Sequence, residues 1–363
     1  MSTRTQPRAT SVPVLTALVD AALAPARLIG AVHAEDWPTP HDAPALPASM
    51  WDGALGDLAR DVLERPSRQF RARLCELAWC LAGGRGPAPS QLSAVVEIAH
   101  AGSLIVDDIE DGSLERRGAA CLHLVYGVPR ALNAGNWMYF WAMDLIDRAA
   151  PTAAVAARIR RAFGEALYHC HLGQALDLSL PAGRIPRAWM YRAVATSTML
   201  KTGALMELAA RLGALAAEAP EPRVAALARF GRMMGLGLQM LDDFGNLTAP
   251  SHDGGDAKAL EDLRNGRPTW PWALVAEGAD IDAAAFQELQ ASALAVGARE
   301  DDDAGTRARA LAARLRMAVG RKGRREAASY LDRALGDLGA SVGDRPELGM
   351  LAAEIRRLEA SYG

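Results

Sequence analysis

Residues 90–111 read SQLSAVVEIAHAGSLIVDDIED, and this stretch indicates the fold because an apolar pattern of helical period runs into a cluster of acids. The apolar positions recur as they do along a buried helix: Leu92, Val95, Val96, Ala99, Leu104 and Ile105. Such a helix places Asp107 and Asp111 one above the other, about 6 Å apart along its axis, with Asp108 beside them. Negative charge is unfavourable at this end of a helix, where the macrodipole is already negative. A bound cation therefore explains the cluster better than a solvated helix end does.

A second helix-like run ends in the same way. Residues 226–247 read ALARFGRMMGLGLQMLDDFGNL and close with Asp242, Asp243 and Asn246. The i and i+4 oxygens again lie on one face. Magnesium prefers oxygen ligands and usually completes its shell with water and substrate phosphates. The pair of clusters therefore predicts a magnesium site that acts on a phosphorylated substrate.

Composition favours helices throughout the chain. Alanine and leucine dominate the 363 residues, aromatic residues make up only 6%, and β-branched runs are short. We predict an all-α protein built as a single large helical bundle. The formal net charge of −3 and the pI near 6.2 leave no basic face that would suit nucleic acid, so no nucleic-acid partner is expected.

The first 51 residues differ from the rest. Residues 1–11 are expected to be a polar tail, residues 14–33 an extra helix, and residues 35–51, with their prolines, a linker. Residues 52–363 show one helical pattern after another, separated by short Gly/Pro breaks, and are expected to form one all-α domain. The breaks fall at residues 82–90, 127–129, 180–186, 218–222 and 248–257.

The cysteines and the apolar N-terminal segment indicate the cellular compartment. Cys75, Cys80, Cys121 and Cys170 are scattered without CxxC pairing, which indicates neither a disulfide framework nor a zinc site. The apolar run 12–26 is interrupted by two prolines and an aspartate, so neither a signal peptide nor stable membrane insertion is expected. We expect a cytoplasmic protein.

Six motifs in this order resemble those of the trans-type polyprenyl diphosphate synthases, and most closely the eukaryotic-type geranylgeranyl diphosphate synthases. They are DDIEDGSLERRG (107–118), GVPRALNAGNWMYF (127–140), GQALDL (173–178), LKTGAL (200–205), LQMLDDFGNL (238–247) and EDLRNGRPTWP (261–271). The resemblance implies the all-α isoprenoid-synthase fold and a homodimer. It also implies a magnesium-dependent reaction that joins isopentenyl diphosphate to an allylic diphosphate primer.

The resemblance also implies roles for individual residues. The metal ligands are Asp107, Asp108, Asp111, Asp242, Asp243 and Asn246, which hold three magnesium ions when diphosphate is bound. The catalytic set is Asp107, Asp108, Asp111, Asp242 and Lys201. The residues expected to hold the allylic diphosphate are Arg116, Lys201 and Lys258. Thr202 and Gln239 match family positions that contact the allylic substrate, and Arg267 is also expected to bind substrate. Isopentenyl diphosphate is assigned to Arg68, Arg71, Arg117 and His100.

Some of these positions depart from the pattern or have a simpler explanation. Ser67 and Arg68 stand where the family usually has glycine and lysine, and Arg267 stands for a lysine. Lys258 comes one residue later than the family's lysine. His100 taken alone is equally explained as a core histidine, and Gln174 with Asp177 as a surface pair.

Product length on this fold depends on how deep an apolar tunnel runs below the metals. One turn before Asp107 lie Gly102 and Ser103, both small, so no aromatic side chain blocks the tunnel there. The next bulky candidates for its floor are Tyr139, Phe140 and His171. These positions resemble the floor of the eukaryotic-type C20 enzymes, so the resemblance implies a C20 product, although Tyr139 and Phe140 could instead pack in the core beside Trp137 and Trp141.

The sequence thus predicts a synthase of geranylgeranyl diphosphate. The alternatives are a terpene cyclase on the same fold, a synthase of C15 or C25 products, and a non-catalytic partner subunit. A cyclase does not need a second diphosphate site, which Arg68, Arg71 and Arg117 indicate here, and a partner subunit is expected to have degenerate metal motifs.

Overall fold

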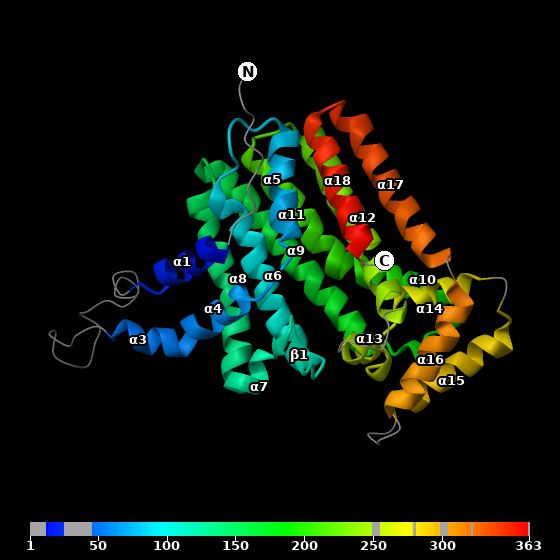
Figure 1. Ribbon diagram of the computed structural model, residues 1–363. Helices are drawn as coiled ribbons and strands as arrows, with labels where there is room; N and C mark the ends of the chain where they lie inside the picture. Colours follow the sequence, from blue (N-terminus) through cyan, green and yellow to red (C-terminus); the bar gives the residue numbers. More distant parts are fainter. Residues whose placement is uncertain are drawn as a thin grey trace. The chain divides into compact units, whose positions relative to one another are not determined.

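In a computed structural model, helices form every large element of the residues that are described (Figure 1). The structure describes residues 12–24, 46–248, 255–278, 281–297, 304–320 and 322–361, without the side chains of residues 12, 13, 248 and 255–259. The predicted polar tail, most of the predicted linker and part of the 248–257 break lie outside these residues. The all-α prediction is confirmed.

Contacts divide the chain into two compact units, and each is described by itself. The first comprises Met1–Glu76 and Gly86–Arg160, and the second comprises Leu77–Arg85 and Arg161–Gly363. Two helices, α5 (Phe70–Ala82) and α9 (Ala153–Ser179), contribute to both units. The other elements of the first unit are α1 (Val12–Ala22), α3 (Ala48–Trp51), the π-helix η2 (Asp52–Gly56), α4 (Asp57–Glu64), α6 (Ser90–Glu110), β1 (Glu115–Arg116), β2 (Ala119–Ala120), α7 (Leu122–Tyr126) and α8 (Val128–Ala149).

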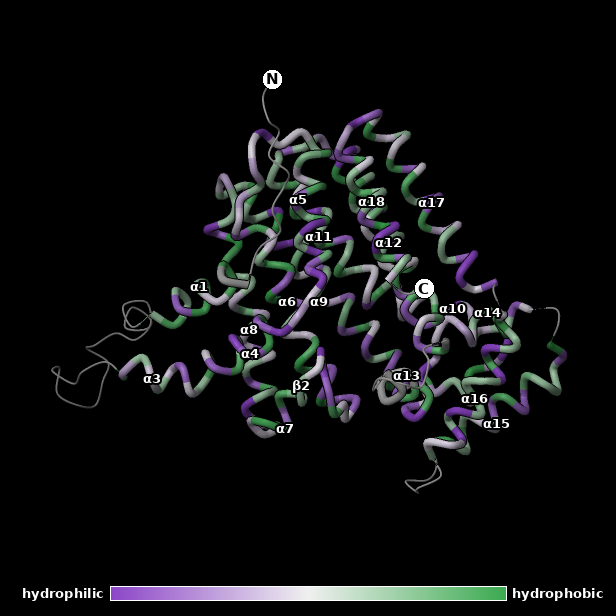
Figure 2. The backbone as a smooth tube through the Cα atoms, viewed as in Figure 1, coloured by the Kyte–Doolittle hydropathy of each residue, from purple (hydrophilic) through white to green (hydrophobic). Residues whose placement is uncertain are grey.

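In the described part of the second unit, all regular elements are helices. Its elements are the 3₁₀-helix η3 (Ala182–Arg184), α10 (Arg187–Thr198), the π-helix η4 (Met199–Gly203), α11 (Ala204–Ala216), α12 (Glu221–Thr248), α13 (Gly255–Arg264), α14 (Trp270–Glu277), α15 (Ala283–Gly297), α16 (Ala304–Val319), α17 (Lys322–Val342) and α18 (Pro346–Ser361). Along α17, hydrophobic and hydrophilic residues alternate with helical period (Figure 2), as expected for a helix with one buried face.

The helices α6 and α8 pack against each other through glycines. A methyl group at Gly102 would lie 2.7 Å from the carbonyl oxygen of Gly135 and 3.0 Å from Cβ of Met138. These distances are too short for a side chain, so the two backbones touch at this point. The contact fixes the helix that carries the first acidic cluster.

The helix α12 also approaches its neighbours at glycines. A methyl group at Gly231 would lie 2.5 Å from the Met206 carbonyl oxygen, and one at Gly235 would lie 2.8 Å from Cα of Gly203. The Gly-rich sequence before the second acidic cluster therefore reflects close packing of α12 against η4 and α11.

The N-terminal helix α1 packs on α4. Its apolar side chains Leu15 and Val19 are buried, as is Leu23 directly after it. Arg60 of α4 pairs with Asp20 at 2.7 Å. The predicted extra helix is therefore present from Val12 to Ala22, and the rest of its predicted span is largely outside the described residues.

None of the described helices contains an apolar stretch long enough to cross a bilayer.

Candidate active site

The first acidic cluster lies where α6 ends. Asp107 and Asp108 occupy its last turn, and Asp111 is the residue that caps it, with its N–H donating to the Asp107 carbonyl at 2.9 Å. The chain then reverses through Gly112 at φ 64°. Asp108 is only 4% exposed, whereas Asp107 and Asp111 are half-buried. The predicted grouping of three acids at one helix end is therefore present.

Arg116 lies against this cluster. Its Nε donates to Oδ1 of Asp108 at 2.6 Å, and its terminal nitrogen lies 3.6 Å from Oδ2 of Asp107. Burial disfavours the charged guanidinium, but the hydrogen bond to Asp108 and its charge outweigh this effect and raise the pKa of Arg116. The arginine predicted to bind the allylic diphosphate thus already lies beside two of the predicted metal ligands.

A short hairpin carries Arg116 and Arg117. β1 and β2 pair antiparallel, with Glu115 opposite Ala120 and Arg116 opposite Ala119. The two turn residues, Arg117 at φ 57° and Gly118 at φ 80°, both have positive φ, as in a type I′ turn. The sequence did not predict this hairpin, because strands of two residues are too short to show alternation.

Arg71 and Arg117 lie near a buried carboxylate, Glu97 of α6. Glu97 accepts a hydrogen bond from the N–H of Ala72 at 2.9 Å. Burial raises the pKa of Glu97, and the charges of Arg71 and Arg117 oppose that rise. Burial in turn lowers the pKa of Arg117, as do the nearby charges of Arg71, Arg116 and Arg65.

The structure thus brings two of the arginines predicted for isopentenyl diphosphate to one place. Arg68 is exposed in the loop before α5, and His100 is half-buried on α6, one helical turn beyond Glu97. Sequence reasoning missed Glu97. Its signal was a single acid inside an otherwise apolar helix, which is unfavourable unless cations lie nearby.

The second acidic cluster lies near the end of α12. Asp243 is 6% exposed and accepts hydrogen bonds from Gln239 Nε2 and from the Trp270 N–H, both at 2.8 Å. Thr202 Oγ1 donates to Gln239 Oε1 at 2.8 Å, which joins two predicted substrate residues to this carboxylate. Burial raises the pKa of Asp243 well above its usual range, with the charges of Asp262 and Asp242 adding to the effect.

Lys201 lies in the π-helix η4. Its Nζ donates to Oδ2 of Asp177 on α9 at 3.0 Å. The backbone of η4 approaches α9 closely: a methyl group at Gly173 would lie 2.8 Å from the backbone nitrogen of Lys201. π-helical turns occur frequently at functional sites. Gln174, for which the sequence also allowed a surface pair with Asp177, is half-buried on α9. Asp177 itself pairs with Lys201.

Other predicted residues fall in varied surroundings. Arg267 is buried and donates to the Asp177 carbonyl at 2.6 Å, so at least one of its nitrogens is used within the protein. Lys258 belongs to α13, and its side chain lies outside the described residues. Asp242 and Asn246 are half-buried on α12, one turn apart.

The residues predicted to set product length differ in exposure. The Tyr139 ring lies 3.6 Å from where a methyl group on Gly102 would be, and the side chain is half-buried. Phe140 is 69% exposed in the single chain, and His171 is exposed on α9. Ser103 donates its hydroxyl to the His100 carbonyl at 2.8 Å.

The donor atoms of both clusters fit magnesium. Every ligand in the predicted set supplies oxygen, and the ion is commonly held by one or two carboxylates together with substrate phosphates. Among the residues whose positions are described, no group of three or more His, Cys, Asp or Glu side chains lies ready to hold a metal by itself. Two of these carboxylates, Asp108 and Asp107, lie against Arg116.

Comparisons with known proteins agree with this description. A crystal structure of geranylgeranyl pyrophosphate synthase has the same fold, with a TM-score of 0.74 at 17% identity over 96% of this chain and 98% of that chain. The chain therefore has the all-α fold of the isoprenoid synthases.

Sequence relatives narrow this class. The family described as Polyprenyl synthetase matches residues 53–297. A geranylgeranyl pyrophosphate synthase from Eremothecium gossypii is 31% identical over 237 residues, or 62% of this chain and 72% of that protein. A terpene synthase from Matsumurasca onukii is 28% identical over 211 residues, or 58% of this chain and 65% of that protein. The chain belongs to the polyprenyl synthetase family, and it is an enzyme of that family.

Proposed function

We propose that the protein is a magnesium-dependent prenyltransferase that adds isopentenyl diphosphate to an allylic diphosphate and releases geranylgeranyl diphosphate. The observation that carries the proposal is the hairpin, on which Arg116 and Arg117 face different groups. Arg116 lies against Asp107 and Asp108, whereas Arg117 lies near Arg71 and Glu97. Two adjacent cationic sites suit two diphosphates, and a terpene cyclase requires only one.

In the proposed reaction, the C–O bond of the allylic diphosphate breaks and its electron pair leaves with the diphosphate. The double bond of isopentenyl diphosphate then forms the new C–C bond at the allylic cation. The intermediate finally loses a proton, which by family resemblance goes to the released pyrophosphate. The carbon skeleton grows by five carbons, and charge is conserved.

The chain's own residues would divide this work. The carboxylates of α6 and α12 would hold magnesium, which when bound neutralises charge on the leaving diphosphate. Lys201 and Arg116 would bind that leaving group, with Thr202 and Gln239 beside the allylic chain. Arg71 and Arg117 would hold isopentenyl diphosphate, because guanidinium forks bind phosphate oxygens in pairs.

Asp177 and Glu97 would act as counter-charges. Asp177 holds Lys201 through its carboxylate, and Glu97 lowers the repulsion between Arg71 and Arg117. Both cationic sites are therefore prearranged for a diphosphate, and this prearrangement reduces the cost of ordering them during binding.

The family match over residues 53–297 supports the region 52–363 as the catalytic part, and the protein is proposed to act as a cytoplasmic homodimer. For product length, the small residues Gly102 and Ser103 and the half-buried Tyr139 support a C20 product. A relative named terpene synthase keeps cyclisation as the second candidate.

The deciding experiment incubates the protein with magnesium, labelled isopentenyl diphosphate and each of the C5, C10 and C15 allylic diphosphates, and then measures product length. The proposal expects a C20 product that requires isopentenyl diphosphate and disappears with a chelator. Hydrocarbon formed from an allylic diphosphate alone would identify a cyclase. No product with any primer would indicate a non-catalytic subunit.

A further inference from the structure

The hairpin 115–120 is too small to hold its own position. It contains two strands of two residues each, and isolated two-stranded hairpins are at best marginally stable in water. Its turn places Arg117 in the left-handed region, which is unfavourable for a residue with a side chain. A contact from outside the hairpin must therefore fix the two arginines that it carries.

Arg65 provides such a contact. It follows the last residue of α4 and is only 8% exposed. One terminal nitrogen donates to the carbonyl oxygen of Arg116 at 3.1 Å, and the other donates to the carbonyl oxygen of Ala120 at 2.9 Å. The first carbonyl belongs to β1 and the second to β2, so one guanidinium binds both strands.

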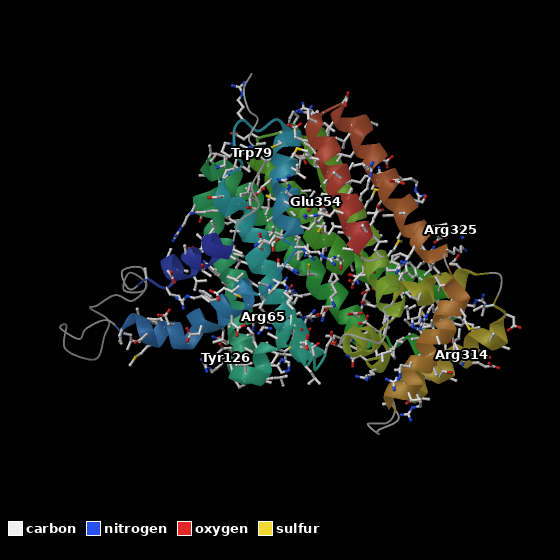
Figure 3. The ribbon with its side chains drawn as sticks, in the orientation of Figure 1. Arg65, Trp79, Tyr126, Arg314, Arg325 and Glu354 are labelled. Carbon is white, nitrogen blue, oxygen red and sulfur yellow. The ribbon has the colours of Figure 1, made fainter. Side chains whose placement is uncertain are left out.

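The guanidinium is held from its other side by α4. Its Nε donates at 2.8 Å to Oδ1 of Asp61, which lies one turn earlier on that helix. The second oxygen of Asp61 accepts a hydrogen bond from the Tyr126 hydroxyl at 3.4 Å. Figure 3 labels Arg65 and Tyr126, which come from neighbouring ends of α4 and α7. The contacts link α4, through Arg65, to both strands of the hairpin.

An arginine is required for this arrangement. Three nitrogen atoms of one planar group point to three acceptors, whereas a lysine ammonium is a compact point charge on a flexible stem. The sequence around Arg65 drew attention only to Arg68 and Arg71, which are predicted to touch substrate. Arg65 instead donates its hydrogen bonds to two backbone carbonyls and to Asp61.

We propose that Arg65 is a positioning residue, which fixes the hairpin 115–120 so that Arg116 and Arg117 meet the two diphosphates in a defined geometry. The proposal rests on the proposed function, because only that function gives the hairpin arginines their substrates. Arg65 acts through the hairpin and does not touch the reacting groups.

The test compares Arg65→Ala and Arg65→Lys with a matched control, Arg60→Ala. Arg60 also lies on α4 and is also ion-paired, but its bonds go to Asp20 and Asp52. Two measurements are made on the full-length protein. Hydrogen exchange of the peptide covering residues 113–121 reports hairpin mobility without reference to activity, and steady-state kinetics separate KM for isopentenyl diphosphate from kcat.

Arg65→Ala should speed exchange in the hairpin peptide while leaving α8 unchanged. It should also raise KM for isopentenyl diphosphate by about tenfold to a hundredfold, since small misplacements of binding groups have effects of that size. Arg65→Lys should restore little of this loss. Arg60→Ala should change neither measurement.

Unchanged exchange in the hairpin peptide of folded Arg65→Ala would overturn the proposal. If that variant does not fold, Asp61→Asn decides, because it leaves Arg65 in place and weakens its anchor; it should shift exchange and KM in the same direction by a smaller factor, and no shift overturns the proposal. Faster exchange in Arg65→Ala, combined with an unaltered KM for isopentenyl diphosphate in Arg117→Ala, would support Arg65 as the residue that fixes the hairpin. The same result would refute the proposed isopentenyl diphosphate site.

Discussion

Nε of Arg116 lies 2.6 Å from Oδ1 of Asp108, so an arginine of the following hairpin partly neutralises the acidic end of α6. This ion pair reduces the repulsion among the three acids, which lie at the end of the helix where negative charge is unfavourable. Arg116 supplies an opposing charge from within the chain. We expect an incoming cation and diphosphate to share these groups, with Asp108 turning to the cation and Arg116 to the diphosphate.

Removing one acid from either cluster should abolish most of the activity. Asp107→Ala and Asp242→Ala should each lower kcat by roughly a hundredfold to a thousandfold, the size of effect seen when one electrostatic contact to a developing charge is lost. Circular dichroism should show unchanged helix content. Asp332→Ala, an exposed aspartate on α17, is the control and should keep full activity. Normal turnover in either cluster variant would contradict the assignment of metal ligands.

Arg117 and Lys201 should fail in different ways. Arg117→Ala should mainly raise KM for isopentenyl diphosphate, because this side chain lies near Arg71 and Glu97. Lys201→Ala should mainly slow ionisation of the allylic substrate and so lower kcat. Lys201 is paired with Asp177 and is not one of the residues around Arg117. Initial rates with each substrate varied in turn distinguish the two defects. Identical defects would mean that the two diphosphate sites are wrongly divided.

Glu76 should make stability depend on pH. Burial of this α5 carboxyl raises its pKa from 4.5 to about 7, with a smaller opposing effect from the charge of Arg73. The folded protein therefore binds the proton more tightly than the unfolded chain does. The free energy of unfolding should fall as pH rises from about 4.5 to about 7, by roughly 3 kcal/mol in total.

Glu76→Gln removes this titration and keeps the shape of the side chain. In urea unfolding at about pH 8, the variant should be more stable than the wild type, and near pH 4.5 the two should be nearly equal. Curves that run parallel over the whole range would show that Glu76 is not the group responsible.

The glycine contact between α6 and α8 should be intolerant of a methyl group. Gly102→Ala should lower the free energy of unfolding by about 1 to 3 kcal/mol, because its Cβ would lie 2.7 Å from a backbone oxygen. Gly164→Ala is the matched control, since it lies on α9 with nothing within 4 Å of its added Cβ. Better helix propensity should stabilise that variant by about 0.5 to 1 kcal/mol. Equal effects of the two substitutions in denaturant titrations would exclude this close contact.

Product length should respond to Tyr139. Tyr139→Ala should lengthen the product beyond C20, because it removes bulk beside Gly102 at the contact of α6 with α8. Ser103→Phe should shorten the product towards C15, because it adds a bulky ring on α6 next to Gly102. Phe140→Ala should lengthen the product less, since its ring is 69% exposed in the single chain. Chromatography of the dephosphorylated products gives the lengths. Wild-type products from all three active variants would place the determinant of length elsewhere.

The sequence predicted those parts of the fold that depend on local periodicity. The helix over 90–111 is observed as Ser90–Glu110, and the run 226–247 lies within Glu221–Thr248. Both predictions held because long apolar patterns leave few alternatives. The grouping of Arg71 with Arg117 was indicated only by family resemblance, since 46 residues of sequence separate them.

Features that depend on contacts between distant segments were missed. Arg65 binds backbone carbonyls 51 and 55 residues away, and every residue has such carbonyls, so the sequence gives no sign of the pairing. Glu97 was passed over for a related reason, because its two cations come from other segments. The partners of Lys201 and Asp243 likewise required the folded chain.

The π-helix η4 has a consequence for how this helix can evolve. α10, η4 and α11 form one uninterrupted helical run, and a π-turn holds one residue more than an α-turn would. The turn is therefore equivalent to a single inserted codon within a straight helix. Losing any one residue between Met199 and Gly203 would convert the wide turn into an ordinary α-turn, so the side chains of this segment would point in new directions while the flanking helices keep theirs. The ion pair of Lys201 with Asp177 and the close contact of Gly203 with Gly235 could then no longer form together. Natural variants are therefore expected to carry substitutions within this segment but to keep its length.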